Sequence, residues 1–153
     1  MSLFTIFKIS SQGMTAQRER LETSASNLAN AHSTRTNDGG PYRRRDILFQ
    51  TVAIQENSSF SDSPSVSLFD DAQSGVPQGV RAGTELAPQD QFIRRFDPGH
   101  PDADADGYVK LPDVDPLEET VNMISAARSF EANATAFNTA KELARATLKL
   151  GEA

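Results

Sequence analysis

The 153-residue chain has no cysteine and only two histidines. Without cysteine it can form no disulfide, no thiolate nucleophile and no cysteine-ligated zinc site. Its apolar runs all fall well short of the roughly 20 residues that a membrane-spanning helix needs. It also lacks a glycine-rich phosphate loop, an HExxH metal motif and a nucleophile elbow. These absences argue against an enzyme and against a membrane-spanning protein.

The formal net charge of -6 is unevenly distributed along the chain. Residues 1–45 are basic, whereas residues 97–119 are strongly acidic with Lys110 as their only base. Complementary regions of this kind predict steering of head-to-tail packing between identical subunits, although ordinary solvated charge is an equally good interpretation. The arginines at 43–45 make a poor footprint for nucleic acid in an acidic protein. We therefore expect no nucleic-acid partner, and we interpret these arginines as a contact with an acidic surface of a neighbouring subunit.

Residues 116–150 have the periodicity of one long helix with apolar side chains on two opposite faces. Asp115 and Glu118 are spaced as a capping box at its start, and Gly151 is placed to end it as a left-handed residue. One face holds Met123, Ala127, Phe130, Ala134, Phe137, Ala144 and Leu148. The opposite face holds Leu117, Val121, Ala132, Ala136, Leu143, Ala146 and Leu150. Because a helix at the rim of a monomer needs only one apolar stripe, the second face predicts contact with neighbouring subunits.

Residues 3–31 predict a second helix with a narrow apolar stripe, part of which repeats at the heptad interval that lets a seam follow a partner helix. The stripe consists of Leu3, Phe7, Met14, Leu21, Ala25 and Leu28. Gly13 weakens the middle of this helix by about 1 kcal/mol relative to alanine. Since such a helix is marginal alone, we expect it to pack against the C-terminal helix as an antiparallel or crossed pair. A closed bundle would need more helices than the middle of the chain supplies.

The middle of the chain combines turn formers with short strand-forming runs. Residues 46–54 predict a strand that is at least partly buried, and residues 79–86 predict a second one. One or two more strands are predicted from Phe92, Ile93 and Phe96, and from Tyr108, Val109 and Leu111. The residues from 55 to 79 are expected to form a long loop. These runs together predict one small antiparallel β unit.

The predicted fold class is therefore α+β, with long terminal helices packed as a coiled-coil-like pair around a small antiparallel β-rich insertion. We divide the chain into an N-terminal helix (1–32), an insertion (33–111) and a C-terminal helix (112–153). The first and last segments are expected to form one helical assembly domain.

An acidic loop precedes the last predicted strand and has the spacing of an EF-hand calcium loop, with Gly107 at the sixth position. Its acids are Asp102, Asp104, Asp106 and Asp113. Against calcium, the twelfth position is aspartate rather than glutamate, no helix precedes the loop, and Pro112 interrupts its end. The alternative interpretation is a charged Asp/Gly turn in which His100 fixes the backbone by hydrogen bonding. A calcium-binding module is the alternative function.

Several motifs resemble those of axial proteins of the bacterial flagellum. The run SNLANA at 26–31, preceded by Ser24 and Ala25, resembles their N-terminal signature. The segment DPGHPDADADGYV at 97–109 and the stretch 114–151 are similar to the corresponding segments of the flagellar proximal-rod (FlgC) family. Departures from that family's pattern are Thr120 where it usually has methionine, Phe130 where it usually has tyrosine, and a long insert after residue 56.

The resemblance implies a structural subunit of the basal-body proximal rod that polymerises through its terminal helices, transmits torque and has no cofactor. It implies type III export, a rod location that spans the periplasm, and contacts with itself, other rod proteins and ring or export-gate components. The N-terminus also lacks the basic leader and apolar core of a cleavable signal peptide. The residues expected at the assembly interface are Leu3, Phe7, Met14, Leu21, Asn27, Leu28, Asn30, Val121, Met123, Ile124, Phe130, Asn133, Phe137, Leu143 and Leu148.

Overall fold

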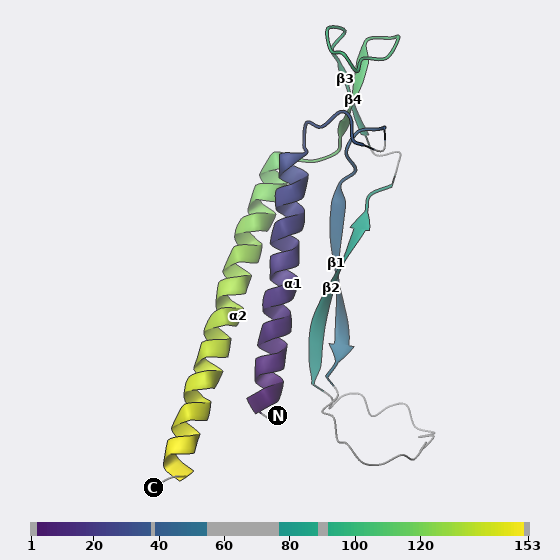
Figure 1. The fold of residues 1–153 in the computed structure, drawn as a ribbon. Helices are drawn as coiled ribbons and strands as arrows, with labels where there is room; N and C mark the ends of the chain where they lie inside the picture. Colours follow the sequence, from purple (N-terminus) through teal and green to yellow (C-terminus); the bar gives the residue numbers. More distant parts are fainter. Residues whose placement is uncertain (1–2, 38, 55–76, 89–91, 152–153) are drawn as a thin grey trace, which may run out of the picture.

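A computed structural model of the chain describes residues 3–37, 39–54, 77–88 and 92–151. In chain order its elements are α1 (Leu3–Ala29), β1 (Arg45–Ala53), β2 (Gln78–Leu86), β3 (Phe92–Phe96), β4 (Tyr108–Pro112) and α2 (Pro116–Gly151). Figure 1 shows α1 and α2 side by side, the β1–β2 ribbon standing next to them, and the β3–β4 hairpin beyond one end of the helix pair. The predicted α+β fold with paired terminal helices is confirmed.

Three further findings concern the predicted loop, the helices and the strands. The loop predicted between 55 and 79 lies almost entirely outside the described residues. No helix within the described part of the chain is long and apolar enough to cross a membrane. The strands begin and end within one or two residues of their predicted limits, because short apolar runs bounded by turn formers are local signals.

The start of α2 is capped by Asp115, as predicted. The Leu117 N–H donates to Asp115 Oδ1 over 2.8 Å, and the Glu119 N–H donates to the Asp115 carbonyl over 3.0 Å. The Glu118 carboxylate accepts a hydrogen bond from Arg44 over 3.1 Å, so the predicted capping box is replaced by a contact with another segment. A single side-chain cap is enough to satisfy the first exposed donors of the helix.

The C-terminal ends of the two helices differ from the prediction. α1 stops at Ala29, where the backbone N–H and the side-chain amide of Asn30 both donate to the Ser26 carbonyl, over 3.1 and 2.9 Å. Gly151 is still part of α2, and it is absent from the glycines that have a positive φ in the described chain. The predicted left-handed stop is therefore wrong. A penalty of about 1 kcal/mol for glycine does not end a helix whose preceding residues favour it.

The helix pair is antiparallel and closely spaced. A Cβ atom added at Gly13 would lie 2.9 Å from the Asn133 side chain, and Asn27 donates to Glu119 over 3.1 Å. These two contacts are 14 residues apart on α1 (27 − 13) and 14 apart on α2 (133 − 119), which is two heptads on each helix. Glycine at position 13 thus leaves room for the Asn133 side chain, which a Cβ atom would displace.

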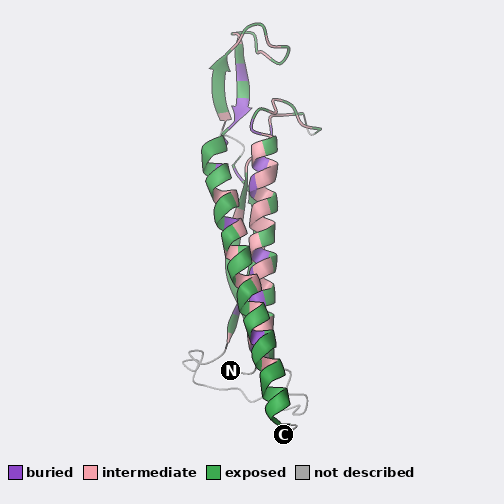
Figure 2. Cartoon of the chain, turned by 90° about the vertical axis from the view of Figure 1, so that its left-hand side faces the viewer, coloured by how far each residue is buried: buried purple, intermediate pink, exposed green. Residues whose placement is uncertain are grey.

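Small and polar residues occupy the centre of the contact between the helices, and large apolar ones flank it. Ser10, Ser24 and Ala126 are buried, whereas Phe7, Met14, Leu21 and Leu28 are only half-buried. Figure 2 shows buried positions recurring along α1 while most of α2 is exposed. The heptad stripe predicted for α1 therefore lies beside the line of closest approach.

The strands form two separate antiparallel ribbons. β1 pairs with β2 from Arg45↔Leu86 to Ala53↔Gln78, and β3 pairs with β4 from Phe92↔Pro112 to Phe96↔Tyr108. The prediction of one β unit is wrong, because β1–β2 packs along α1 whereas β3–β4 lies beyond the helix ends and the two ribbons share no edge.

β1 is much more exposed than predicted. Leu48, Phe49 and Val52 are all exposed, Ile47 is half-buried, and the first fully buried residue is Ile54, just after the strand. A two-stranded ribbon has two faces, and among the described helices and strands only α1 packs against it. Within the described residues the other face has no covering layer, which a run of apolar letters cannot reveal.

Candidate assembly site

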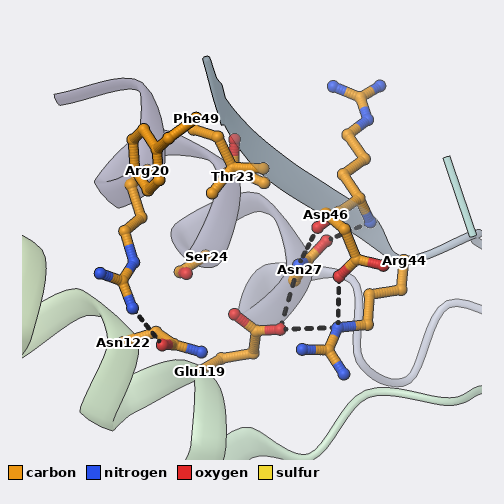
Figure 3. A pocket seen from close by; sticks show the side chains of 11 residues that line it. Arg20, Thr23, Ser24, Asn27, Arg44, Asp46, Phe49, Glu119 and Asn122 are labelled. Carbon is orange, nitrogen blue, oxygen red and sulfur yellow. Dashed lines mark hydrogen bonds and ion pairs between the residues drawn. The ribbon is translucent and has the colours of Figure 1, made fainter. Parts of the chain in front are cut away.

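A buried asparagine joins three segments where α1 ends. Asn27 is 1% exposed. Its Nδ2 donates to the Arg45 carbonyl over 2.8 Å and to Glu119 Oε1 over 3.1 Å. Its Oδ1 accepts from the Arg45 N–H and from the Tyr42 hydroxyl, each over 2.9 Å. Both donors and both acceptor positions of the amide are thereby used, so α1, the start of β1 and α2 are held at one point (Figure 3).

Glu119 carries a negative charge into this junction and is 2% exposed. Arg44 Nε lies 3.2 Å from Glu119 Oε1 and 3.3 Å from Asp46, and its Nη2 lies 3.1 Å from Glu118. Burial of the guanidinium lowers the pKa of Arg44, but the hydrogen bond to Glu118 and the charges of all three acids together raise it above its ordinary value. A buried carboxylate is costly without a partner, and Arg44 and Asn27 supply both charge and hydrogen bonds.

The side chains of Arg43 and Arg44 bond within their own chain. Arg43 donates to the Ala87 carbonyl just after β2, and Arg44 pairs with acids at the start of α2. The prediction that this arginine run contacts an acidic surface of a neighbour is wrong for these two residues. The turn after α1 brings Arg44 against the acidic start of α2, which is distant in sequence and which a local pattern therefore does not indicate as its partner.

A polar pocket opens beside the junction, between α1, β1 and α2 (Figure 3). Arg20 lies on its wall and donates to Asn122 Oδ1 over 2.8 Å, which ties α1 to α2 one heptad before Asn27. The Phe49 ring covers another part of the wall. Arg44 forms ion pairs with Asp46 and Glu119, and Arg20 is hydrogen-bonded to Asn122. The arrangement suits holding segments together, not bond chemistry.

The acidic loop after β3 is an internally bonded turn. Asp104 Oδ1 accepts the Tyr108 N–H over 2.8 Å, and Asp104 Oδ2 pairs with Arg94 over 3.4 Å. The hydrogen bond from the Tyr108 N–H is the main cause that lowers the pKa of Asp104. Gly107 has a φ of 80°, the left-handed conformation that this turn requires.

Asp102, another acid of that loop, is also hydrogen-bonded within the chain. Asp102 accepts a hydrogen bond from the Thr34 hydroxyl over 2.7 Å, and its N–H donates to His100 Nδ1 over 3.1 Å, which confirms the turn-fixing role of His100. Among the described residues, no three or more histidine, aspartate or glutamate side chains come together so that they could hold a metal ion. The calcium interpretation thus has no support from its predicted ligands, which were Asp102, Asp104, Asp106 and Asp113.

The outer face of α2, defined as Leu117, Val121, Ala132, Ala136, Leu143, Ala146 and Leu150, is fully open in the single chain. Its four large side chains, those of leucine and valine, are each more than half exposed. Every alanine of this face is exposed as well. A row of apolar residues without cover along a helix marks an interaction surface.

Comparison with known proteins covers both ends of the chain. Residues 7–35 match the family described as "Flagella basal body rod protein", and residues 105–150 match "Flagellar basal body rod FlgEFG protein C-terminal". A protein named flagellar basal-body rod protein FlgC from Borreliella burgdorferi is 40% identical over 98% of each chain. Proteins of the same name from Escherichia coli O157:H7 and Bacillus subtilis are 39% and 35% identical, each over 99% of this chain and 100% of the relative. The chain belongs to the FlgC family of flagellar basal-body rod proteins.

Membership of the FlgC family confirms the resemblance inferred from the motifs and makes the chain a structural protein of the flagellar rod. The relatives are named as rod proteins, which is a structural role. For a FlgC-family chain, the features that matter are therefore its packing surfaces and the junction that orients them.

The residues predicted for the interface, apart from Leu3, divide into three groups within this FlgC-family chain. Asn27 and Asn30 bond inside their own chain, and Phe7 packs its ring against the edge of Phe137 with 4.9 Å between centroids. The exposed group consists of Val121, Ile124, Phe130, Leu143 and Leu148. The half-buried group includes Met14, Leu21, Leu28, Met123 and Asn133, and the side chain of Leu3 lies outside the description.

Sequence reasoning missed Glu119, Tyr42 and Arg44 as parts of the junction. One signal was available for Glu119: it stands one heptad before buried Ala126 and two before Asn133, so it shares their side of the helix. A carboxylate on the buried side of a helix needs a partner for its charge.

Proposed function

We propose that this FlgC-family chain polymerises into the proximal rod through its terminal helices, burying the outer face of α2 between subunits and so transmitting torque. The observation that carries the proposal is the exposure of that face in an otherwise ordered helix. Burial of leucine and valine side chains as exposed as these is worth about 1–2 kcal/mol each. Several such contacts per subunit supply the free energy that association costs.

Torque transmission needs a subunit that does not change shape under load. The saturated amide of Asn27 and the ion pairs of Arg44 fix the β1–β2 ribbon to the helix pair at one end. A buried amide that uses all its hydrogen-bonding positions, together with close ion pairs, rigidifies the segments that it joins. We infer that these contacts maintain the angle between ribbon and helices while force passes from copy to copy.

The partners in this proposal are copies of the chain, other rod proteins, and ring or export-gate components at the base of the rod. We further propose that the chain is exported by a type III route without a cleavable signal peptide and resides in the part of the rod that crosses the periplasm. Association with other rod components follows from the family; the named partners and the route are inferences from the same resemblance.

The outer face can be tested with Leu143→Asp, because Leu143 is exposed and its replacement should leave the chain's own packing intact. We expect this variant to be exported and folded but absent from purified basal bodies, since a charge would be buried in an interface. Phe137→Asp should also abolish rods, but it would break the ring contact with Phe7 as well. Asn138→Asp, at an exposed position of the same helix, is the matched control, and cells that carry it should swim normally. Normal rods from Leu143→Asp would contradict the proposal.

A further inference from the structure

Three consecutive residues of α1 show what surrounds the helix. Gln12 faces β2, since its Oε1 would lie against a Cβ added at Gly79. Gly13 faces Asn133 of α2. Each step along a helix turns the side chain by about 100°. Since Gln12 points to the ribbon and Gly13 to α2, Met14 points to the side of the helix pair opposite the β1–β2 ribbon. This side has no covering element among the described residues.

A continuous apolar surface follows that open side. The contact between Phe7 and Phe137 places one residue of each helix on it. Met14 comes seven residues after Phe7, and Phe130 comes seven residues before Phe137. Because the helices are antiparallel, Met14 and Phe130 lie at the same height along the pair. We name this surface the open stripe; it consists of Phe7, Met14, Leu21, Leu28, Met123, Phe130 and Phe137. All of these side chains are half-buried except Phe130, which is 39% exposed.

The outer face of α2 points away from the open stripe. Leu117 and Val121 stand two residues to either side of Glu119, which faces α1 through Asn27. Two residues correspond to a rotation of about 200°, so both side chains lie on the far side of α2 from α1. The molecule therefore has two different apolar surfaces that face in different directions.

We propose that these two surfaces are each other's partners: the outer face of α2 in one copy lies along the open stripe of the next copy. This rests on the proposed function, namely that copies assemble through their helices. A surface that paired with itself would give a two-fold dimer and stop, whereas contact between two different surfaces leaves one of each free and continues. Growth of a rod requires the second kind of contact.

The shapes and sizes of the two surfaces fit this pairing. The middle of the outer face is made of small residues, Ala132 and Ala136, whereas the middle of the open stripe carries the large side chains of Met14 and Phe130. A 36-residue helix is about 54 Å long and about 10 Å wide, so one face offers roughly 500 Å². That is below the roughly 800 Å² per partner of a stable pair. Single contacts are thus weak, and several neighbours together hold each copy.

Disulfide trapping tests the pairing. Because the chain has no cysteine of its own, any disulfide between copies of the chain must come from the engineered cysteines. Met14→Cys is combined in turn with Val121→Cys, Ala132→Cys or Leu143→Cys, which sample different levels of the outer face. Basal bodies from swimming cells are oxidised and separated without reducing agent. Poorly assembling variants are expressed together with the unaltered chain, which carries them into rods.

We expect at least one of the double variants to give a ladder of dimers, trimers and larger products, since each copy carries both halves of the link. Each single variant should remain monomeric. Dimers from a single outer-face variant such as Val121→Cys would mean that this face meets itself, and they would overturn the proposal. Intact rods in which no double variant forms a ladder would also overturn it. Both outcomes leave helix-mediated assembly standing, whereas normal rods from Leu143→Asp count against assembly itself.

Discussion

Replacement of Asn27 by alanine removes the centre of the junction, and its cost can be worked out from the contacts. The change removes four hydrogen bonds, those to the N–H and carbonyl of Arg45, to the Tyr42 hydroxyl and to the Glu119 carboxylate. A hydrogen bond of this kind contributes about 1 kcal/mol net, which gives roughly 4 kcal/mol. Water entering from the adjacent pocket recovers part of it, so we expect a loss of about 3 kcal/mol in the free energy of unfolding.

That loss is a large fraction of the 5–15 kcal/mol typical of a domain. It is measured by urea unfolding of the purified full-length chain, followed by far-ultraviolet circular dichroism. With a denaturant slope of about 2 kcal/mol per molar, the midpoint should fall by roughly 1.5 M. An unchanged slope would show that the native state was destabilised without a change in the surface exposed on unfolding.

Asn30→Ala is the matched control, because the Asn30 amide bonds only to Ser26 and Ser33 nearby. We expect it to cost about 1 kcal/mol or less. Tyr42→Phe, which removes one bond to Asn27, should cost about 1 kcal/mol. The reasoning is refuted if Asn27→Ala destabilises the chain no more than Asn30→Ala does.

Two further predictions concern helix spacing and pH. Gly13→Ala should destabilise the chain by about 1 kcal/mol, because the new Cβ meets Asn133. In an Asn133→Ala background the same change should stabilise the chain by about that amount, because the helix preference of alanine then prevails. Urea midpoints of the unaltered chain, the two single variants and the double variant decide this. Because the Tyr108 N–H lowers the pKa of Asp104, this carboxylate stabilises the turn above its ordinary pKa and stops doing so as the pH falls through the lowered value. The Tyr108 amide signal in NMR should therefore move only at low pH, and this movement should be lost in Asp104→Asn.

The helices could be predicted because their signals are local. Asp115 precedes the α2 apolar pattern by the spacing that a cap requires, and the heptad interval in α1 is visible without knowing its partner. The family motifs were equally readable, since short runs such as residues 26–31 do not depend on the fold. Local periodicity and capping thus account for most of the architecture.

The junction could not be predicted, because its contacts link residues that are distant in sequence. Asn27 meets Tyr42 across 15 positions and Glu119 across 92. The exposure of Leu48 and Val52 was missed for a related reason, since a strand that is apolar on both faces indicates burial only if the chain provides a layer for each face. The Asp102 loop had the spacing of a calcium site, but hydrogen bonds to the backbone decided its geometry.

The two helices are unequal in length, and this has a mechanical consequence. Phe7 meets Phe137; α1 begins four residues before the first of these, at Leu3, while α2 continues 14 residues past the second, to Gly151. About ten residues of α2, or roughly 15 Å, therefore project past the start of α1 with Leu148 and Leu150 uncovered. Flush end-to-end stacking would leave this overhang without a partner. In the proposed assembly we therefore expect successive copies to overlap along their length, so that a twisting load on one copy is shared with the next.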